Sequence, residues 1–208
     1  MNSVQETSPA VTTVNLLSAS DYDLPLNIES VLARRGVPQD FLKYMMTEKQ
    51  KEAFDDSIGY YLHGTVGTRK TGTAVTMMRE IMIRNSRPYK IDTMVRGIYD
   101  AWFFPVTTIL GRIKSSFRPE AAETEADVID RVSSPALIVL DDLGTEKVTE
   151  WTLQTLYTII DIRSRNNRQT IITSNLGLEQ LGNHLSDRIS SRIRGMCKVV
   201  LMTGKDRR

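Results

Sequence analysis

The chain has 208 residues, of which 40% are hydrophobic and 25% charged, and its formal net charge is +2. This composition is typical of a globular protein with one substantial core and excludes a fibrous or low-complexity chain. We expect no membrane span or secretory signal, and a cytoplasmic location, because no run of about 18 apolar residues is present. With one cysteine, Cys197, and two histidines, neither an internal disulfide nor a Cys/His zinc site is expected.

The charge is distributed unevenly along the chain. The first 30 residues contain four acidic residues and no Lys or Arg, whereas residues 187–208 contain seven Lys and Arg against two Asp, a balance of +5. A basic segment of this kind forms either a solvated face or a surface that binds the phosphates of a nucleotide or of DNA.

The N-terminal part predicts a tail followed by helices. Residues 1–20 have no helical or strand periodicity, which indicates a mobile tail. The pattern of residues 24–36 predicts a short helix that ends at Gly36, and residues 40–54 predict a second helix. We therefore expect residues 1–35 to form a tail with a short helix and residues 36–208 to form the functional domain.

From residue 58 onward, short apolar runs alternate with helical patterns, as in βαβ units. Strands are expected at 58–63, 101–106, 136–140, 170–173 and 198–202. Helices are expected at 71–85, within 92–104, and at 107–117, 123–132, 150–166, 177–184 and 186–194. The fold class is therefore α/β, with a mostly parallel central sheet flanked by helices.

A glycine-rich segment lies between the first of these strands and the helix after it. Its residues are Gly64, Thr65, Val66, Gly67, Thr68, Arg69, Lys70 and Thr71. A helix N-terminus preceded by such a turn presents unpaired N–H groups and a positive dipole end to phosphate oxygens. We expect Lys70 to contact the β- and γ-phosphates of ATP and the Thr71 hydroxyl to ligate Mg²⁺.

Arg69 departs from the usual G-x-x-x-x-G-K-[ST] pattern, because it occupies the place of the second glycine. A side chain there crowds the phosphates or forces a backbone angle that costs roughly 1–2 kcal/mol, about tenfold in affinity. The positive charge of Arg69 offsets part of this loss. Hydrolysis is thus a separate prediction from the fold, and the alternative is a nucleotide-independent adaptor that binds DNA or protein.

A second signal is the pair of acids that ends the predicted strand 136–140. Carboxylates at the carboxyl end of a buried parallel strand point into the crevice where ligands bind. We expect Asp141 to hold Mg²⁺, directly or through water, and Asp142 to polarise the attacking water. Asn175, after the next predicted strand, either orients water beside the γ-phosphate or forms a turn.

Arginines close to the C-terminus are candidates for contacts with nucleotide. Arg192 and Arg194 lie on a predicted short helix, and either one can add positive charge to the nucleotide of a neighbouring subunit. Arg207 is a weaker candidate for a sensor of the chain's own nucleotide. A small-molecule kinase on a P-loop fold is a further alternative, although no segment resembles a lid for an acceptor substrate.

Four motifs occur together in order. They are Gly64-Thr-Val-Gly-Thr-Arg-Lys-Thr, then Leu140-Asp-Asp-Leu-Gly-Thr-Glu-Lys with Glu150-Trp151, then Ile171-Ile-Thr-Ser-Asn-Leu, then Asp187-Arg-Ile-Ser-Ser-Arg-Ile-Arg-Gly-Met. In these motifs the chain resembles, over about residues 36–208, the AAA+ ATPase domain of bacterial replicative-helicase loaders and of the ATP-binding helpers of insertion-sequence transposases.

The resemblance implies a three-layer P-loop NTPase fold of AAA+ type and a reaction that converts ATP and water to ADP and phosphate. It implies roles for these residues: Lys70 and Thr71 in Walker A, Asp141 and Asp142 in Walker B, Asn175 as first sensor, Arg192 as arginine finger in trans, and Arg207 as second sensor. The implied partners are single-stranded or duplex DNA, a replicative helicase or transposase, and further copies of the chain, with ATP sites between subunits. The chain departs from the family at Arg69 and at Gly72-Thr73, where larger residues often follow Lys-Thr.

Overall fold

The computed structural model describes residues 28–86 and 99–204. The expected tail at 1–20, the start of the 24–36 helix, most of the 92–104 segment and Arg207 lie outside the described residues.

Five strands form one sheet in which each neighbouring pair is parallel. They are β1 (Gly59–His63), β2 (Ala101–Pro105), β3 (Leu137–Asp141), β4 (Gln169–Ser174) and β5 (Cys197–Leu201), in the order β2-β3-β4-β1-β5. All five lie where the sequence predicts them. The register pairs Leu62 with Thr173 and Leu140 with Ile172, so β1, β3 and β4 end at the same edge of the sheet.

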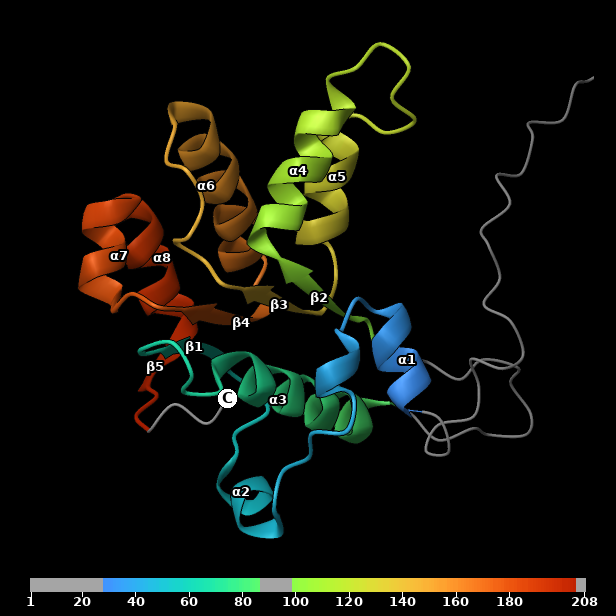
Figure 1. Cartoon of the computed structure of the whole chain (residues 1–208), viewed down its shortest axis with the longest axis vertical. Coiled ribbons are helices and arrows are strands. Elements are labelled where there is room, and N and C mark those ends of the chain that lie inside the picture. Colours follow the sequence, from blue (N-terminus) through green and yellow to red (C-terminus); the bar gives the residue numbers. More distant parts are fainter. Residues whose placement is uncertain (1–27, 87–98, 205–208) are drawn as a thin grey trace, which may run out of the picture.

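Helices cover both faces of this sheet, which makes three layers (Figure 1). One face carries α1 (Ile28–Arg34), α2 (Glu48–Ala53) and α3 (Lys70–Asn85); the other carries α4 (Val106–Ser116), α5 (Glu125–Ser133), α6 (Glu150–Arg165), α7 (Leu178–His184) and α8 (Asp187–Met196). Strand β3 shows why both faces are apolar. Its Ile138 and Leu140 pack into the core under α4–α8, whereas Leu137 and Val139 pack into the core over α3.

The prediction of one helix over residues 40–54 is wrong. The segment contains a short 3₁₀ turn, Gln39–Phe41, and then α2, which begins only after Thr47. The Thr47 hydroxyl accepts a hydrogen bond from the Gln50 N–H, and the Gln50 side chain accepts one from the Thr47 N–H. This capping box fixes a helix start at Thr47, so the preceding residues are left as a loop over α3.

Helix α1 packs onto the α3 face of the sheet. Its Ile28, Val31 and Leu32 are buried in the same apolar cluster as the inner side of α3. The short helix is thus integrated with the core, while a domain boundary between residues 35 and 36 stays a prediction. Cys197 is buried in the core. Within the described ranges, no helix has the length and apolar character needed to cross a bilayer.

One charged side chain lies entirely in the core. Arg163 of α6 is 0% exposed and donates hydrogen bonds to the carbonyls of Ser133, Pro135 and Gln169 and to the Thr170 hydroxyl. Burial lowers the pKa of its guanidinium to about 9. Arg163 therefore joins the end of α5 to the loops that enter β3 and β4.

Candidate nucleotide-binding site

A cavity of about 630 Å³ lies at the carboxyl edge of the sheet. This volume is within the usual range for small-molecule sites. The cavity is lined by residues that follow three parallel strands, together with the segment before α2: Asp40, Phe41, Tyr44, Val66, Gly67, Arg69, Lys70, Thr71, Gly72, Asp141, Asp142, Thr173 and Asn175. The fold thus brings eight of the predicted site residues to one place.

The remaining loop residues shape the turn. Gly64 has φ 151°, and a Cβ on it would collide with the Met202 carbonyl. The Thr68 hydroxyl donates to the Thr65 carbonyl at 2.8 Å. The Lys70 ammonium is 8% exposed and donates to the Gly64 and Thr65 carbonyls, both at 2.9 Å. The Lys70 ammonium thus lies inside the curve of the loop.

Arg69 takes the left-handed conformation that its position in the loop predicts for glycine. Its φ and ψ are 62° and 29°, and it immediately precedes the first residue of α3. The loop therefore keeps its turn with a side chain present, at an expected cost of about 1–2 kcal/mol. The side chain of Arg69 lines the cavity and adds a second positive charge beside Lys70.

Two hydroxyl groups donate hydrogen bonds to the same carboxylate oxygen at the floor of the cavity. The Thr71 hydroxyl donates to Asp141 Oδ1 at 2.9 Å, and the Thr173 hydroxyl donates to the same oxygen at 2.7 Å. Burial raises the pKa of Asp141, while the two hydroxyl bonds oppose this rise. Among the described residues no cluster of three or more His, Cys, Asp or Glu exists. A hydroxyl beside a carboxylate is nevertheless the donor set that fits Mg²⁺ bound together with nucleotide phosphates.

Asp142 and Asn175 form the wall beside this floor. Asp142 has φ 64°, and its N–H donates to the Thr173 hydroxyl at 2.8 Å. The Asn175 amide donates to Asp142 Oδ1 at 3.3 Å. The end of β4 therefore orients both the backbone and the carboxylate of Asp142, which lines the cavity without contacting Thr71 directly.

Arg192 and Arg194 do not line this cavity. Arg192, on α8, donates through its Nε to Asp161 of α6 at 2.8 Å and lines a different cavity. Arg194 is exposed. Neither arginine contributes to the chain's own nucleotide cavity.

Sequence comparisons show which known proteins this chain resembles. No family model matches the chain. Over 144 residues it is 24% identical to the replicative helicase loader DnaC of Escherichia coli K12, an alignment that covers 69% of this chain and 53% of DnaC. Over 174 residues it is 24% identical to the helicase loader DnaI of Bacillus subtilis, covering 83% of this chain and 49% of DnaI. The chain is thus similar in sequence to bacterial replicative helicase loaders.

Solved structures agree with this relation. The crystal structure of the DnaC helicase loader superposes with a TM-score of 0.58 and 23% identity, covering 74% of this chain and 84% of that one. The DnaI structure gives 0.57 and 23% identity, covering 91% and 89%. AMPPCP-bound DnaA from Aquifex aeolicus gives 0.57 and 19% identity, covering 74% and 44%. The chain has the AAA+ P-loop fold that the sequence predicted.

These relatives support the helicase-loader half of the expected resemblance and give no specific support to the transposition-helper half. The chain spans about half the length of the curated proteins it matches. The activity, substrates and partners of the complete loaders are therefore only proposed for this chain.

Sequence reasoning missed four residues of the cavity: Asp40, Phe41, Tyr44 and Thr173. Phe41 and Tyr44 pack edge to face with their ring centres 5.4 Å apart. A Cβ on Gly72 would lie 2.5 Å from Tyr44 Cε2, so any larger residue here would force this ring to move. In the sequence, the unusual glycine after Lys70-Thr71 was the signal that another group packs closely against the start of α3.

Proposed function

We propose that this chain binds ATP with Mg²⁺ at the carboxyl edge of its sheet and hydrolyses it in an assembly that loads a replicative helicase on DNA. The observation that carries the proposal is the contact between the Thr71 hydroxyl and Asp141, because it joins the glycine-rich loop to the acid of β3 as a ready pair of Mg²⁺ donors. The sequence relation to helicase loaders supports the loading role.

Each residue then has a definite task. The loop N–H groups and Lys70 hold the phosphates, and Thr71 with Asp141 holds the metal, which neutralises phosphate charge when bound. Asp142, oriented by Asn175, lies where it can accept a hydrogen bond from the attacking water. One solved structure with a similar fold is the replication initiator DnaA bound to AMPPCP and single-stranded DNA, which supports nucleotide and DNA as ligands of this fold.

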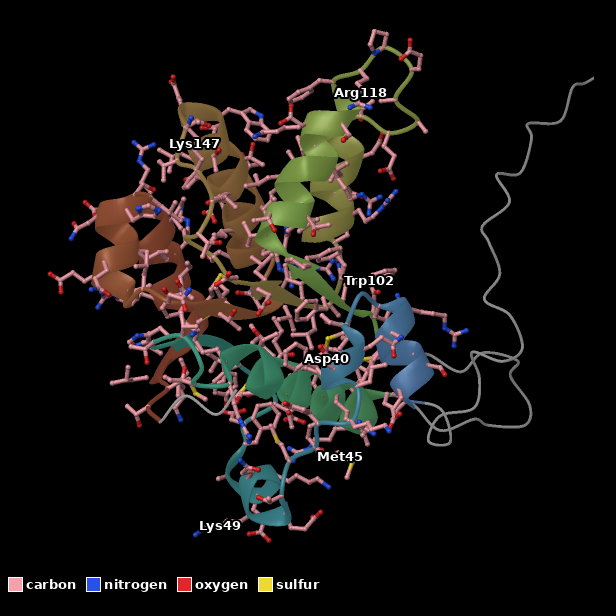
Figure 2. The ribbon with its side chains drawn as sticks, in the orientation of Figure 1. Asp40, Met45, Lys49, Trp102, Arg118 and Lys147 are labelled. Carbon is pink, nitrogen blue, oxygen red and sulfur yellow. The ribbon has the colours of Figure 1, made fainter. Side chains whose placement is uncertain are left out.

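The decisive experiment is binding of labelled ATP with Mg²⁺ to the purified chain. Lys70→Ala removes a buried charge from the loop and should abolish binding. Lys49→Ala is the matched control, because Lys49 is exposed at the tip of α2, away from the cavity (Figure 2). Absence of wild-type binding at millimolar ATP, or equal binding by Lys70→Ala, would overturn the proposal.

DNA is the proposed second ligand, and an aromatic surface with positive charges supports it. Phe117, at the end of α4, is 57% exposed and packs edge to face on Trp151. The Lys114 ammonium lies 5.4 Å from the centre of the Trp151 ring, and Arg118 follows at the outer end of α4 (Figure 2). An exposed aromatic ring beside cations suits stacking on single-stranded bases. Because the cations would meet phosphates, DNA affinity should fall steeply as salt rises.

The adaptor without nucleotide stays the second candidate because of Arg69. Its left-handed backbone and its place in the cavity are the two features that would weaken ATP binding. Replacement of Arg69 by glycine and by alanine separates the two functions.

A further inference from the structure

One threonine of β4 lies between the two acids that follow each other at the end of β3. Thr173 is 1% exposed, and its hydroxyl donates a hydrogen bond to Asp141 Oδ1 at 2.7 Å. The same hydroxyl accepts a hydrogen bond from the Asp142 N–H at 2.8 Å. A threonine hydroxyl has one hydrogen and two lone pairs, so it can serve both acids at once. Thr173 therefore links the side chain of the first acid to the backbone of the second.

The hydrogen bonds to Asp141 determine which of its oxygens is available. The Thr71 hydroxyl also donates to Oδ1, at 2.9 Å. Within the described residues, no hydrogen bond reaches the other oxygen, Oδ2. Oδ2 is therefore the oxygen left for Mg²⁺ or for a water bound to it. Thr71 is itself a proposed ligand of the metal, whereas the hydroxyl hydrogen of Thr173 serves only to hold Asp141.

The backbone of Asp142 needs support from outside its own turn. Its φ is 64°, in a region that residues with a Cβ adopt uncommonly. Besides the bond between the Asp142 N–H and the Thr173 hydroxyl, the Leu143 N–H donates to the Thr173 carbonyl at 2.9 Å. The Ser174 hydroxyl donates to the Leu143 carbonyl at 2.6 Å. Of these groups at the end of β4, only the Thr173 hydroxyl also contacts a carboxylate.

We propose that Thr173 is a positioning residue of the nucleotide site, because its hydroxyl holds both the Asp141 carboxylate for the metal and the Asp142 backbone for the attacking water. The inference rests on the proposed function, since both acids act on bound nucleotide. It divides the work of the site between two segments. The loop with Lys70 grips the phosphates, and the end of β4 sets both acids. Loss of the Thr173 hydroxyl should therefore impair the metal-dependent steps and spare phosphate binding without metal.

The first test compares the dissociation constant of labelled ATP for the full-length chain with saturating Mg²⁺ and with EDTA. Thr173→Val keeps the branched side chain that suits a strand and removes only the hydroxyl. The gain in affinity that Mg²⁺ gives should fall about tenfold or more, as is usual when a metal-binding carboxylate loses a hydrogen-bond partner. The affinity in EDTA should stay at the wild-type value. Thr173→Ser keeps a hydroxyl and should retain most of the Mg²⁺ gain.

Turnover gives a second measurement, and another threonine of the same strand gives the control. At saturating ATP and Mg²⁺, turnover should fall about tenfold or more in Thr173→Val and recover largely in Thr173→Ser. Thr170→Val is the matched control, because it removes a second buried hydroxyl of β4, one that contacts Arg163 and neither acid. This control should lower the melting temperature and leave the Mg²⁺ gain unchanged.

A double variant tests whether the effect on the metal passes through Asp141. In an Asp141→Ala chain the carboxylate that Thr173 holds is gone. Adding Thr173→Val should then reduce the Mg²⁺ gain no further, because two residues that act through one contact are not additive. A further loss in this background would overturn the positioning role of Thr173.

Three other results would overturn the inference and leave the nucleotide site standing. They are an unchanged Mg²⁺ gain in Thr173→Val, an equal loss in Thr173→Ser, and a parallel loss of affinity in EDTA, which would show that the hydroxyl merely supports the fold. Lys70→Ala, by contrast, should lower the affinity both with Mg²⁺ and with EDTA. Absence of wild-type ATP binding in both conditions would overturn the proposed function, and the inference with it.

Discussion

Replacing Arg69 with glycine tests two effects of this residue on the nucleotide loop: the strain of its left-handed backbone and the positive charge of its side chain. The residue has φ 62° and ψ 29°, a conformation that costs a non-glycine residue about 1–2 kcal/mol. Glycine removes this cost but gives the unfolded chain more freedom, which costs about 0.4–1 kcal/mol. The net gain in the free energy of unfolding is therefore between zero and about 1.6 kcal/mol. For a chain of this size, that raises the melting temperature by up to roughly 6 °C.

Arg69→Ala is the matched control, because alanine keeps the left-handed strain and removes only the charged side chain. Thermal unfolding followed by circular dichroism should rank Arg69→Gly above Arg69→Ala. Labelled-ATP titration should give Arg69→Gly an affinity within about tenfold of wild type, since lost strain and lost charge act in opposite directions. A lower melting temperature for Arg69→Gly would refute the strain argument. ATP binding that appears only in Arg69→Gly would instead establish the adaptor.

Three further substitutions test contacts that hold the site and the core. Tyr44 lines the nucleotide cavity, and we expect its ring to contact the base of bound ATP. Gly72→Ala should displace this ring, since the new Cβ would lie 2.5 Å from Tyr44 Cε2, and should weaken ATP binding by roughly tenfold, as expected for a lost stacking contact. Tyr44→Ala should lower the ATP affinity by the same factor, and the double variant should lose no more than either single variant. ATP titration measures this, and additive losses would show that the two residues act separately. Arg163→Met should lower the free energy of unfolding by about 3 kcal/mol or more, because several buried carbonyls lose their donor. Urea unfolding measures this, and a change below about 1 kcal/mol would contradict it.

The sequence predicted the strands well because each is a short apolar run between turn-forming residues, as in β3. It also placed the loop, Asp141 and Asn175 correctly at one edge, since parallel strands bring their carboxyl ends together. Helix α2 was predicted too long, because the apolar residues between 41 and 46 fit a helical spacing. Their actual partner is α3, which lies far along the chain.

Pairings between distant elements were beyond the reach of sequence patterns. Nothing in the spacing of Asp161 and Arg192 indicates that they meet, because the contact depends on how α6 and α8 pack on the sheet. The sequence gives equally little indication that Tyr44 packs on Gly72, because glycine has no side chain whose pattern could be read. Burial of Arg163 likewise follows from tertiary packing, as α6 alone gives no reason for an arginine among apolar neighbours.

The two cavities give the chain a direction, with the glycine-rich loop at one edge of the sheet and a cavity lined by Arg168 and Arg192 at the other. If copies of the chain meet through these unlike edges, each contact repeats head to tail, and such contacts close into a ring or grow into an open filament rather than forming a two-fold symmetric dimer.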